Sequence, residues 1–389
     1  MNESARRILY VHNSADLYGA SRSLCRLMSV LDRQRFEPLV VLPEAGPLAK
    51  GLEKLGVRVL VEPSLAIVSR YTSFVRTLLI HFPVSTWRIT RLIRRERVAL
   101  VHTNVGVIFS PAVSARLARV PHVWHIRESF EEFCGGMWAV YAAYMRGFSA
   151  RIISVSSANA AQFPDQRNVE VIHNGFAAAD FTVPDDSARR AARQQFGVSA
   201  AEFVTGCVGR IKLVRKGQEY LIQAAHFLKQ RGWNMKHLIV GSPYRGNESH
   251  LERLSALVHD LELDGDVIFT GELQDTKAAY AAMDVFVLPS AQSEPFGGVV
   301  MEAMAYALPV IATSIGGSLD QVEDGVTGFL VPPADPAALA EKIEQLARDG
   351  QRGKAMGRAG RARLAEKFDL QRMARRVEAL YDELLPVKG

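Results

Sequence analysis

The sequence predicts an α/β protein made of two Rossmann-like domains, each built on a doubly wound parallel sheet. Its 389 residues suit two domains with full hydrophobic cores. Short apolar runs alternate with longer helical patterns from end to end, as expected of parallel βα units. The alternation restarts after residues 173–186, a segment with Asn-Gly, a proline and acids that is typical of a linker. Because such sheets bind ligands at the carboxyl ends of their strands, we expect function in the loops that follow strands.

Each half of the chain contains a series of short apolar runs that predict strands. In the first half these runs are 8–12, 37–42, 57–61, 100–103, 122–126, 151–155 and 169–172. In the second half they are 203–208, 236–241, 267–271, 285–288, 310–313 and 328–331.

The pattern divides the chain into three parts. These are a domain at 1–178, a domain at 179–365, and a C-terminal helix at 366–389 that is expected to pack back on the first domain. The helix is indicated by apolar residues three or four positions apart, namely Leu370, Met373, Val377, Leu380 and Leu384. No chemistry is expected of this helix.

Composition places the protein among ordinary globular chains of a reducing compartment. Hydrophobic residues make up 48% and charged residues 23%. Three cysteines (Cys25, Cys134 and Cys207) are too few and too distant for a disulfide framework or a zinc site. The early apolar run at 8–11 is too short for a signal peptide, and the uncharged stretch 98–115 is too polar to span a membrane. We therefore expect a cytoplasmic protein without a transmembrane helix.

Positive charge is concentrated in the first half. Residues 1–180 hold 22 Lys and Arg against 14 Asp and Glu, whereas the remainder holds 25 against 27. Residues 65–98 form a basic amphipathic segment with seven arginines and one acid, interleaved with large apolar residues. Such a segment can lie on an anionic membrane surface, or it can be a solvated helix face that keeps the protein soluble. Nucleic acid is not expected as a partner, since no aromatic platform or helix-turn-helix pattern accompanies the charge.

The loop after 203–208 has the composition of a phosphate site. Gly209-Arg210 is followed by Lys212, Arg215 and Lys216, and Gly217 opens a predicted helix. A glycine turn, fixed cations and a helix N-terminus together favour a phosphate-bearing ligand. The alternative is an ordinary basic surface loop.

A second motif runs from residue 293 to 304 and carries two acids. Glu294 lies in a loop with Pro295, and Glu302 falls on the second turn of a helix that begins near Gly297. Both carboxylates can hydrogen-bond a polyhydroxylated ligand whose phosphates face the helix N-terminus. Alternatives are a solvent-facing acid pair or a glycoside hydrolase pair, but the adjacent basic loop favours a phosphorylated donor.

In this order, the motifs resemble the retaining family 4 glycosyltransferases of the GT-B architecture. The motifs are Gly209-Arg210 with Lys216-Gly217, Glu294-Pro-Phe-Gly-Gly with Glu302-Ala-Met, Gly316-Gly317, and Asp324-Gly-Val-Thr-Gly-Phe-Leu-Val. Weaker matches in the first half are Gly19-Ala20-Ser21, Trp124-His-Ile-Arg-Glu and the segment 171–176. The resemblance spans nearly the whole chain, and it implies two domains that face each other across a cleft.

The resemblance also implies roles for individual residues. The domain at 179–365 would bind a nucleotide diphosphate sugar, with Arg210 and Lys216 neutralising the diphosphate in place of a metal and stabilising it as the leaving group. Glu302 would accept the ribose hydroxyls, and Glu294 would hold the transferred sugar. The implied donor-binding set is Arg210, Lys216, Gly271, Leu273, Glu294, Phe296, Gly297, Gly298, Val299 and Glu302; the implied catalytic set is Glu294, His125, Arg210 and Lys216.

The domain at 1–178 would face the acceptor. Gly19, Ala20 and Ser21 match the family's glycine-rich acceptor or phosphate loop, and His125 matches its pocket histidine. Without the resemblance, His125 at a strand end can equally satisfy a buried backbone group. The family retains the anomeric configuration, which is usually explained by front-face attack assisted by the departing phosphate; Glu294 as a covalent nucleophile is the chemical alternative.

Two positions depart from the family pattern. Five residues separate Arg210 from Lys216 where four are usual, so Lys212 or Arg215 can share the role of Lys216. Asp320 stands where the family commonly has Glu.

The expected function is therefore transfer of a hexose or N-acetylhexosamine to a glycan or lipid-linked glycan acceptor in cell-surface polysaccharide biosynthesis. No metal or other cofactor is expected, and a UDP-sugar is favoured over a GDP-sugar as co-substrate. The 65–98 segment suggests a peripheral place on the inner face of the cell membrane. The alternatives are a nucleotide-sugar 2-epimerase and a catalytically silent nucleotide-sugar-binding protein.

Overall fold

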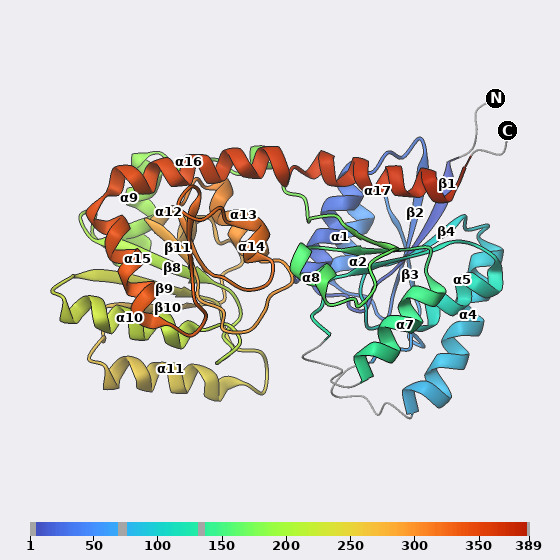
Figure 1. Cartoon of the computed structure of the whole chain (residues 1–389), viewed down its shortest axis with the longest axis horizontal. Coiled ribbons are helices and arrows are strands. Elements are labelled where there is room, and N and C mark those ends of the chain that lie inside the picture. The colour runs from blue at the N-terminus through green and yellow to red at the C-terminus, as the bar shows by residue number, and fades with distance from the viewer. Residues whose placement is uncertain (1–4, 69–75, 131–136, 387–389) are drawn as a thin grey trace. The chain divides into compact units, whose positions relative to one another are not determined.

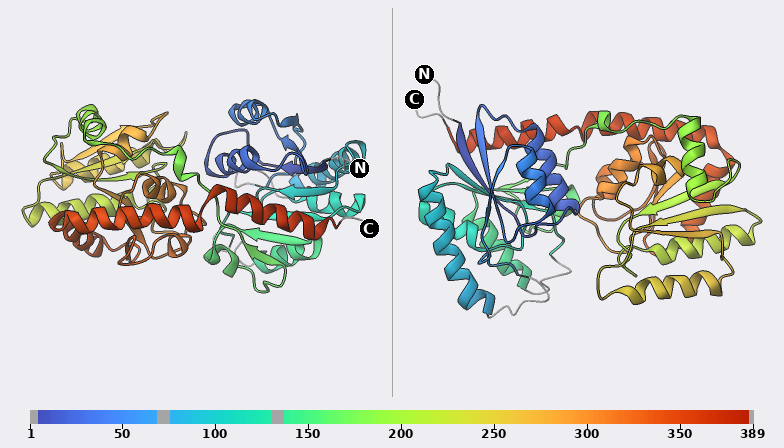
Figure 2. Two further views of the ribbon diagram at one scale, coloured as in Figure 1. Left: turned by 90° about the horizontal axis from the view of Figure 1, so that it is seen from above. Right: turned by 180° about the vertical axis from the view of Figure 1, so that it is seen from behind.

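The computed structural model of the chain describes residues 5–68, 76–130 and 137–386. Contacts within the chain group into two units. Unit 1 is Met1–Gly175 together with Phe368–Gly389, and unit 2 is Phe176–Lys367. Each unit contains its own parallel sheet with helices packed on both sides (Figure 1 and Figure 2).

The sheet of unit 1 has the strand order β3-β2-β1-β4-β5-β6-β7, with parallel neighbours throughout. The order changes direction at β1 and β4, which is the point where doubly wound sheets bind ligands. The strands are β1 Arg6–Val11, β2 Phe36–Leu42, β3 Arg58–Val61, β4 Leu100–Thr103, β5 His122–Ile126, β6 Arg151–Ser154 and β7 Val169–Val171.

Alternate residues of these strands face different helices. Leu9 and Val11 join an apolar cluster with residues of α4 and α5, whereas Tyr10 faces the other way and meets Tyr381 of α17. The helices of unit 1 are α1 Gly19–Val30, α2 Pro47–Lys54, η1 Thr77–His81, α4 Phe82–Arg95, α5 Ser110–Ala118, α7 Trp138–Phe148, α8 Ser157–Ala161 and α17 Leu370–Leu384.

The sheet of unit 2 has the order β10-β9-β8-β11-β12-β13, again with parallel neighbours, and changes direction at β8 and β11. The strands are β8 Phe203–Val208, β9 Met235–Val240, β10 Val267–Gly271, β11 Val285–Leu288, β12 Val310–Thr313 and β13 Gly328–Val331. The helices are η3 Ala178–Asp180, α9 Asp186–Gln195, α10 Gln218–Gln230, α11 Glu248–Asp260, α12 Lys277–Ala282, α13 Gly298–Ala305, α14 Ser318–Gln321, α15 Pro336–Arg348 and α16 Gly350–Lys367.

This architecture confirms the fold predicted from the sequence. Each expected strand is present, with ends that differ by at most two residues from those expected. Strand β1 begins two residues early, at Arg6, because Arg6 pairs with Phe36 of β2. In α17, Leu370, Met373, Val377 and Leu380 are buried, and the helix lies beside α1 within unit 1.

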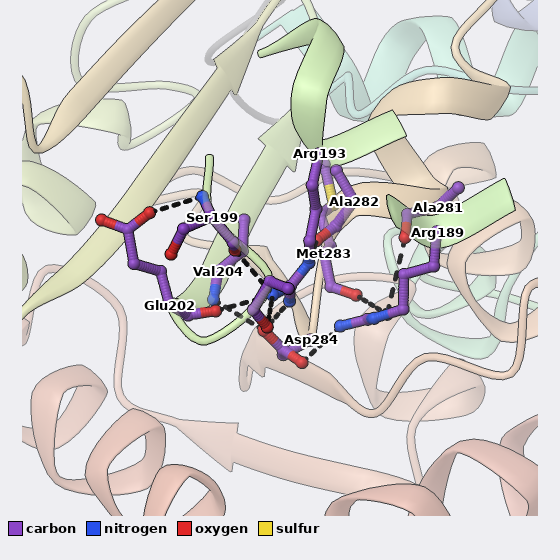
Figure 3. Close-up of polar contacts among 10 residues, drawn as sticks. Arg189, Arg193, Ser199, Glu202, Val204, Ala281, Ala282, Met283 and Asp284 are labelled. Carbon is purple, nitrogen blue, oxygen red and sulfur yellow. Dashed lines mark hydrogen bonds and ion pairs between the residues drawn. The ribbon is translucent and has the colours of Figure 1, made fainter. Parts of the chain in front are cut away.

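A cluster of ion pairs fastens α9 to the amino ends of β8 and β11 in unit 2 (Figure 3). The Asp284 carboxylate accepts hydrogen bonds from Arg193 at 2.6 Å, from the Val204 N–H at 2.7 Å, and from Arg189. The Arg193 side chain is only 4% exposed. Its guanidinium also donates to four backbone carbonyls, those of Ala282, Ser199, Ala200 and Glu202. The buried Arg193 cation is therefore held by backbone carbonyls, and within this cluster the Asp284 carboxylate is its counter-charge.

Replacing Asp284 by Asn is expected to destabilise unit 2 by about 3 kcal/mol, because it leaves the Arg193 guanidinium buried without its counter-charge. Chemical denaturation measures this change. Asp264→Asn is the matched control, since Asp264 is 68% exposed and its ion pair is with the exposed His259; its cost is expected below about 1 kcal/mol. Equal effects of the two substitutions would contradict the role given to Asp284.

Candidate functional site

The predicted phosphate loop leaves β8 at the switch point of unit 2. Gly209 has φ +155°, a conformation that favours glycine. The Arg210 side chain is exposed, and its guanidinium carbon lies 5.1 Å from the centre of the Tyr244 ring, as in a cation–π contact. The Ile211 N–H donates to the Ser242 carbonyl, which joins this loop to the loop after β9.

The extra residue of this loop is accommodated by backbone strain. Val214 has φ +64°, which is unfavourable for a β-branched residue, and its side chain is 54% exposed. The Lys216 N–H donates to the Lys212 carbonyl and closes the turn. The loop therefore carries its additional residue as an outward turn at Val214 and returns Lys216 to the sheet edge.

Lys216 and Glu294 form the central contact of the site. The Lys216 Nζ lies 2.7 Å from Oε1 of Glu294, and the two side chains are 27% and 13% exposed. The Ser290 hydroxyl donates to the same carboxylate oxygen. Burial opposes ionisation of Glu294, but Lys216 and Ser290 outweigh it, so the pKa of Glu294 is lowered. The pair is thus charged at neutral pH, and its contribution to stability is lost only as the pH falls through this lowered pKa.

Gly217 allows this contact because no side chain fits at its position. Its φ is +69°, and an added Cβ would lie 1.8 Å from the Pro289 carbonyl oxygen. Gly217 caps the N-terminus of α10, so the loop passes directly from Lys216 into the helix against β11. The glycine after Lys216 is therefore required for steric reasons.

Gly316 and Gly317 hold the loop that carries Glu294. The Gly317 N–H donates to the Glu294 carbonyl at 2.7 Å. A Cβ on Gly316 would lie 2.4 Å from the same carbonyl oxygen, and one on Gly317 would lie 2.5 Å from that of Pro295. These two glycines therefore pack closely against the backbone of Glu294 and Pro295.

Glu302 lies on α13, the helix that follows the Glu294 loop. The helix begins at Gly298 with Gly297 as its N-cap, as expected, and the Gly297 carbonyl accepts a hydrogen bond from Gln321. Oε2 of Glu302 accepts a hydrogen bond from the Tyr280 hydroxyl at 2.9 Å. Phe296 precedes the N-cap and Val299 is the second residue of the helix, whose first N–H groups have no partner within the helix.

Gly271 is the last residue of β10, and Leu273 lies two residues further along the chain. Gly271 is exposed with φ +69°, and its carbonyl accepts the Gly241 N–H at 2.9 Å. A Cβ on Gly241 would lie 2.1 Å from the Gly209 carbonyl oxygen. Close backbone packing thus links the ends of β8, β9 and β10, with β9 between the strand that precedes Arg210 and the strand that ends at Gly271.

The remaining predicted residues belong to unit 1. His125 is 1% exposed, and its Nδ1 lies near His102 and Arg127, whereas its Nε2 has no hydrogen-bond partner. Burial first, and then Arg127, holds the pKa of His125 well below its ordinary value, so the ring is neutral.

Gly19, Ala20 and Ser21 form the first turn of α1 rather than a loop. The Ser21 hydroxyl lies 3.0 Å from His12 Nε2 and donates to Asp16 at 3.0 Å. Asn104 connects His12 to Arg127, since its amide lies 3.2 Å from His12 Nδ1 and its oxygen accepts from the Arg127 guanidinium.

Sequence reasoning did not single out several residues of these networks. In unit 2 they are Gly241, Tyr280 and Ser290; in unit 1 they are His12, Asp16, Asn104 and Tyr381. The signal in unit 1 was present, because polar residues alternate at three strand ends: Tyr10 and His12, His102 and Asn104, His125 and Arg127. A period of two places these pairs on one face of the sheet.

The arrangement in unit 2 provides fixed cations, a helix N-terminus and two hydrogen-bonding carboxylates at one sheet edge, which suits a sugar carrying phosphates. Among residues 5–68, 76–130 and 137–386, no three His, Cys, Asp or Glu side chains are grouped to hold a metal ion. Over the same ranges, each helix is too short or too polar to cross a membrane.

Two family models match the chain. The model described as "Glycosyltransferase Family 4" matches residues 18–180, and the one described as "Glycosyl transferases group 1" matches residues 202–349. Together they cover most of both units.

Individual relatives agree with these models. The capsular polysaccharide biosynthesis glycosyltransferase CapM of Staphylococcus aureus is 37% identical over 47% of this chain and 47% of its own. A GDP-mannose-dependent phosphatidylinositol monomannoside mannosyltransferase of Mycolicibacterium smegmatis is 34% identical over 50% of this chain and 55% of its own. The matched parts thus span about half the length of these curated relatives.

A solved structure matches over almost the full length. Anabaena HepE in complex with UDP is 26% identical, covers 97% of this chain and 100% of its own, and superposes with a TM-score of 0.84. The same protein has also been crystallised with UDP-glucose.

Gly217→Ala is expected to destabilise unit 2 by more than the backbone strain alone, which costs about 1–2 kcal/mol for a left-handed residue. The excess arises because the new Cβ must displace the Pro289 carbonyl. Gly232→Ala is the matched control, since Gly232 has φ +80° but open space around it. Thermal or chemical denaturation compares the two variants, and equal losses of stability would rule out the steric role of Gly217.

Proposed function

The chain belongs to the family 4 glycosyltransferases, a retaining and metal-independent family, and from this premise we propose the reaction it performs. We propose that it transfers a hexose or N-acetylhexosamine from a nucleotide diphosphate sugar to a glycan or lipid-linked glycan in cell-surface polysaccharide biosynthesis. UDP is the favoured nucleotide. This preference is supported by the UDP and UDP-glucose complexes of HepE, while the GDP-mannose dependence of one relative supports the rival base.

The observation that carries the proposal is the Lys216–Glu294 pair at the switch point of unit 2. In the free protein the ammonium of Lys216 and the carboxylate of Glu294 form an ion pair. When a donor binds, its diphosphate offers Lys216 a second anion, and the sugar hydroxyls offer Glu294 uncharged donors. The pair therefore keeps both side chains oriented before the donor arrives, which reduces the cost of ordering them.

In the proposed reaction, Lys216 and Arg210 stabilise the negative charge that develops on the departing diphosphate. Glu302 accepts hydrogen bonds from the ribose, Glu294 holds the sugar ring, and the N–H groups at Gly297 and Gly298 contact sugar or phosphate oxygens. Such fixed donors act most strongly where charge develops in the transition state, so they lower the barrier rather than only tighten binding.

Retention follows from the direction of attack in this proposal. The acceptor hydroxyl approaches the anomeric carbon on the face that the diphosphate leaves, and its proton passes to the departing phosphate oxygen. The C–O bond to the diphosphate breaks while the bond to the acceptor oxygen forms. Glu294 has a lowered pKa and accepts hydrogen bonds from both Lys216 and Ser290, an arrangement that orients it as a hydrogen-bonding group and weakens it as a nucleophile.

Thermal unfolding with a panel of nucleotide sugars tests the donor proposal. A UDP-sugar present at roughly 100 times its dissociation constant is expected to stabilise the protein by about 2.7 kcal/mol. Glu302→Ala and Arg210→Ala are expected to lose most of this shift. Stabilisation by GDP-sugars alone would overturn the preference for UDP, and conversion of a donor to its epimer without acceptor would identify the alternative enzyme class.

The membrane part of the proposal depends on η1 and α4 in unit 1. Leu79 and Trp87 are 69% and 61% exposed, which is unusual for such large apolar side chains. A groove of about 510 Å³ has Trp87 in its wall. Its lining residues are Phe82, Pro83, Thr86, Trp87, Thr90, Arg91, Arg94 and Leu117. Of the basic segment 65–98, residues 69–75, including Arg70, lie outside the described residues.

We propose that this surface lies on the anionic inner face of the cell membrane. Arg91 and Arg94 are exposed on the same helix as Trp87, and the Arg91 guanidinium carbon lies 5.7 Å from the Trp87 ring centre. Exposed apolar side chains flanked by arginines match the boundary between lipid headgroups and acyl chains. A lipid-linked acceptor would be reached from this position.

Co-sedimentation with vesicles tests the membrane proposal. The protein is expected to bind vesicles rich in phosphatidylglycerol at low salt and to remain free of phosphatidylcholine vesicles. Arg91→Gln with Arg94→Gln should weaken binding by about 2 kcal/mol, at about 1 kcal/mol per charge. Trp87→Ser should weaken it as well. Leu55→Ser, at another exposed apolar residue of unit 1, should not. Failure of the unaltered protein to bind anionic vesicles would contradict this surface.

A further inference from the structure

The groove beside α4 in unit 1 is apolar at one end and cationic at the other. Its lining residues come from α4 and from Leu117 of the neighbouring α5 (Figure 1). Phe82 and Pro83 line it at the start of α4, whereas Arg91 and Arg94 line it near the end of that helix. The two ends lie roughly 15 Å apart along the helix axis. Such a groove suits an amphiphile that has an apolar chain and an anionic group.

The middle of the groove has small floor residues and large apolar walls. Thr86 and Thr90 line it and are buried, and the Thr90 hydroxyl already donates to the Thr86 carbonyl. Trp87 and Leu117 line it as well and are exposed. The volume of about 510 Å³ lies in the range of small-molecule sites. An apolar chain in the groove would therefore remove two large side chains from water, which is favourable.

Two of the four arginines of α4 are neutralised by acids, and these two do not line the groove. Arg88 forms an ion pair with Glu62 at 2.8 Å, and Arg95 forms one with Glu96 at 3.1 Å. The positive charges of Arg88 and Arg95 are therefore already compensated within unit 1.

The other two arginines, Arg91 and Arg94, line the groove and have no carboxylate partner among residues 5–68, 76–130 and 137–386. Arg94 donates to the Leu117 carbonyl at 3.0 Å, and the Arg91 guanidinium lies over the Trp87 ring. A guanidinium has five N–H donors, so both side chains keep most of theirs for an anion. Two exposed arginines about one turn apart suit a phosphate, which guanidinium groups bind through paired hydrogen bonds.

The direction of the groove agrees with the membrane surface proposed above. η1 runs directly into α4, and its residues Leu78, Leu79 and Ile80 are exposed. They precede the apolar end of the groove, so they would enter the acyl region of a bilayer while Arg91 and Arg94 would lie at the level of the lipid phosphates. A lipid in the groove would thus keep the orientation that it has in the bilayer.

We propose that this groove is a binding site for one anionic phospholipid of the membrane, whose phosphate lies between Arg91 and Arg94 and whose acyl chain lies against Trp87 and Leu117. The site rests on the membrane part of the proposed function and goes beyond it, because it assigns one lipid to one place instead of a general attraction between a basic surface and an anionic leaflet.

Calorimetric titration with dihexanoylphosphatidylglycerol, kept below the concentration at which it forms micelles, tests the site on the whole protein. Saturable binding of one lipid per chain is expected. Glycerophosphoglycerol, which is the same headgroup without acyl chains, is expected to bind at least about tenfold more weakly, because burial of the chain adds to the affinity. Absence of saturable binding, or equal affinity for the two probes, would overturn the proposal.

Two pairs of substitutions separate a site from general attraction to positive charge. Arg91→Gln with Arg94→Gln is expected to weaken binding of dihexanoylphosphatidylglycerol at least about tenfold. Arg88→Gln with Arg95→Gln is the matched control, since it removes two charges from the same helix away from the groove; its effect is expected to be less than about threefold. All four side chains are exposed, and thermal unfolding verifies that both variants fold. Equal weakening by the two pairs would overturn the site.

Vesicle binding by the same proteins distinguishes failure of this site from failure of the membrane proposal. A protein that sediments with phosphatidylglycerol vesicles but gives no saturable binding of the single lipid would keep the membrane surface and lose the site. If neither form of lipid is bound, both proposals are wrong. Neither measurement depends on glycosyl transfer, so loss of the proposed reaction would not by itself change these results.

Discussion

The ion pair between Lys216 and Glu294 is the interaction that joins the two loops of the proposed donor site in unit 2. Two distant loops, one after β8 and one after β11, must meet at one sheet edge for the charges to be 2.7 Å apart. Gly217 permits the first loop to touch β11, and Gly316 with Gly317 permits the second to be clamped. The glycines of these motifs are thus explained by close contact with neighbouring backbone. This close contact brings the charged side chains of Lys216 and Glu294 together.

In unit 1, too, polar side chains gather where parallel strands end, but here they form a buried hydrogen-bond network. Parallel strands present their carboxyl ends at one edge, and the alternation of residues places Tyr10, His102 and His125 on the face covered by α17. Burying so many polar groups is unfavourable unless each is hydrogen-bonded, so the network has few alternative arrangements. Burial and the nearby Arg127 keep His125 neutral.

The sequence was sufficient for the fold, the strand positions and the motifs of unit 2, because strands, glycine turns and helix starts are local features. It could not rank Lys212, Arg215 and Lys216, since that depends on the outward turn at Val214. Nor could it find Tyr381. Apolar spacing in α17 predicts that the helix is buried, but the contact between Tyr381 and His102 joins residues 279 positions apart and depends on strand register. Long-range hydrogen bonds of this kind leave no periodic signal.

The central claim is that Lys216, oriented by Glu294, holds the diphosphate of a nucleotide sugar. Calorimetric titration with UDP and with uridine tests it most directly. Lys216→Met should weaken UDP binding at least tenfold, or about 1.4 kcal/mol, and should leave uridine binding unchanged, because uridine lacks the phosphates that Lys216 would contact. The uridine titration also controls for damage to the site from the unpaired Glu294. Equal weakening of both ligands, or no weakening of either, would contradict the account.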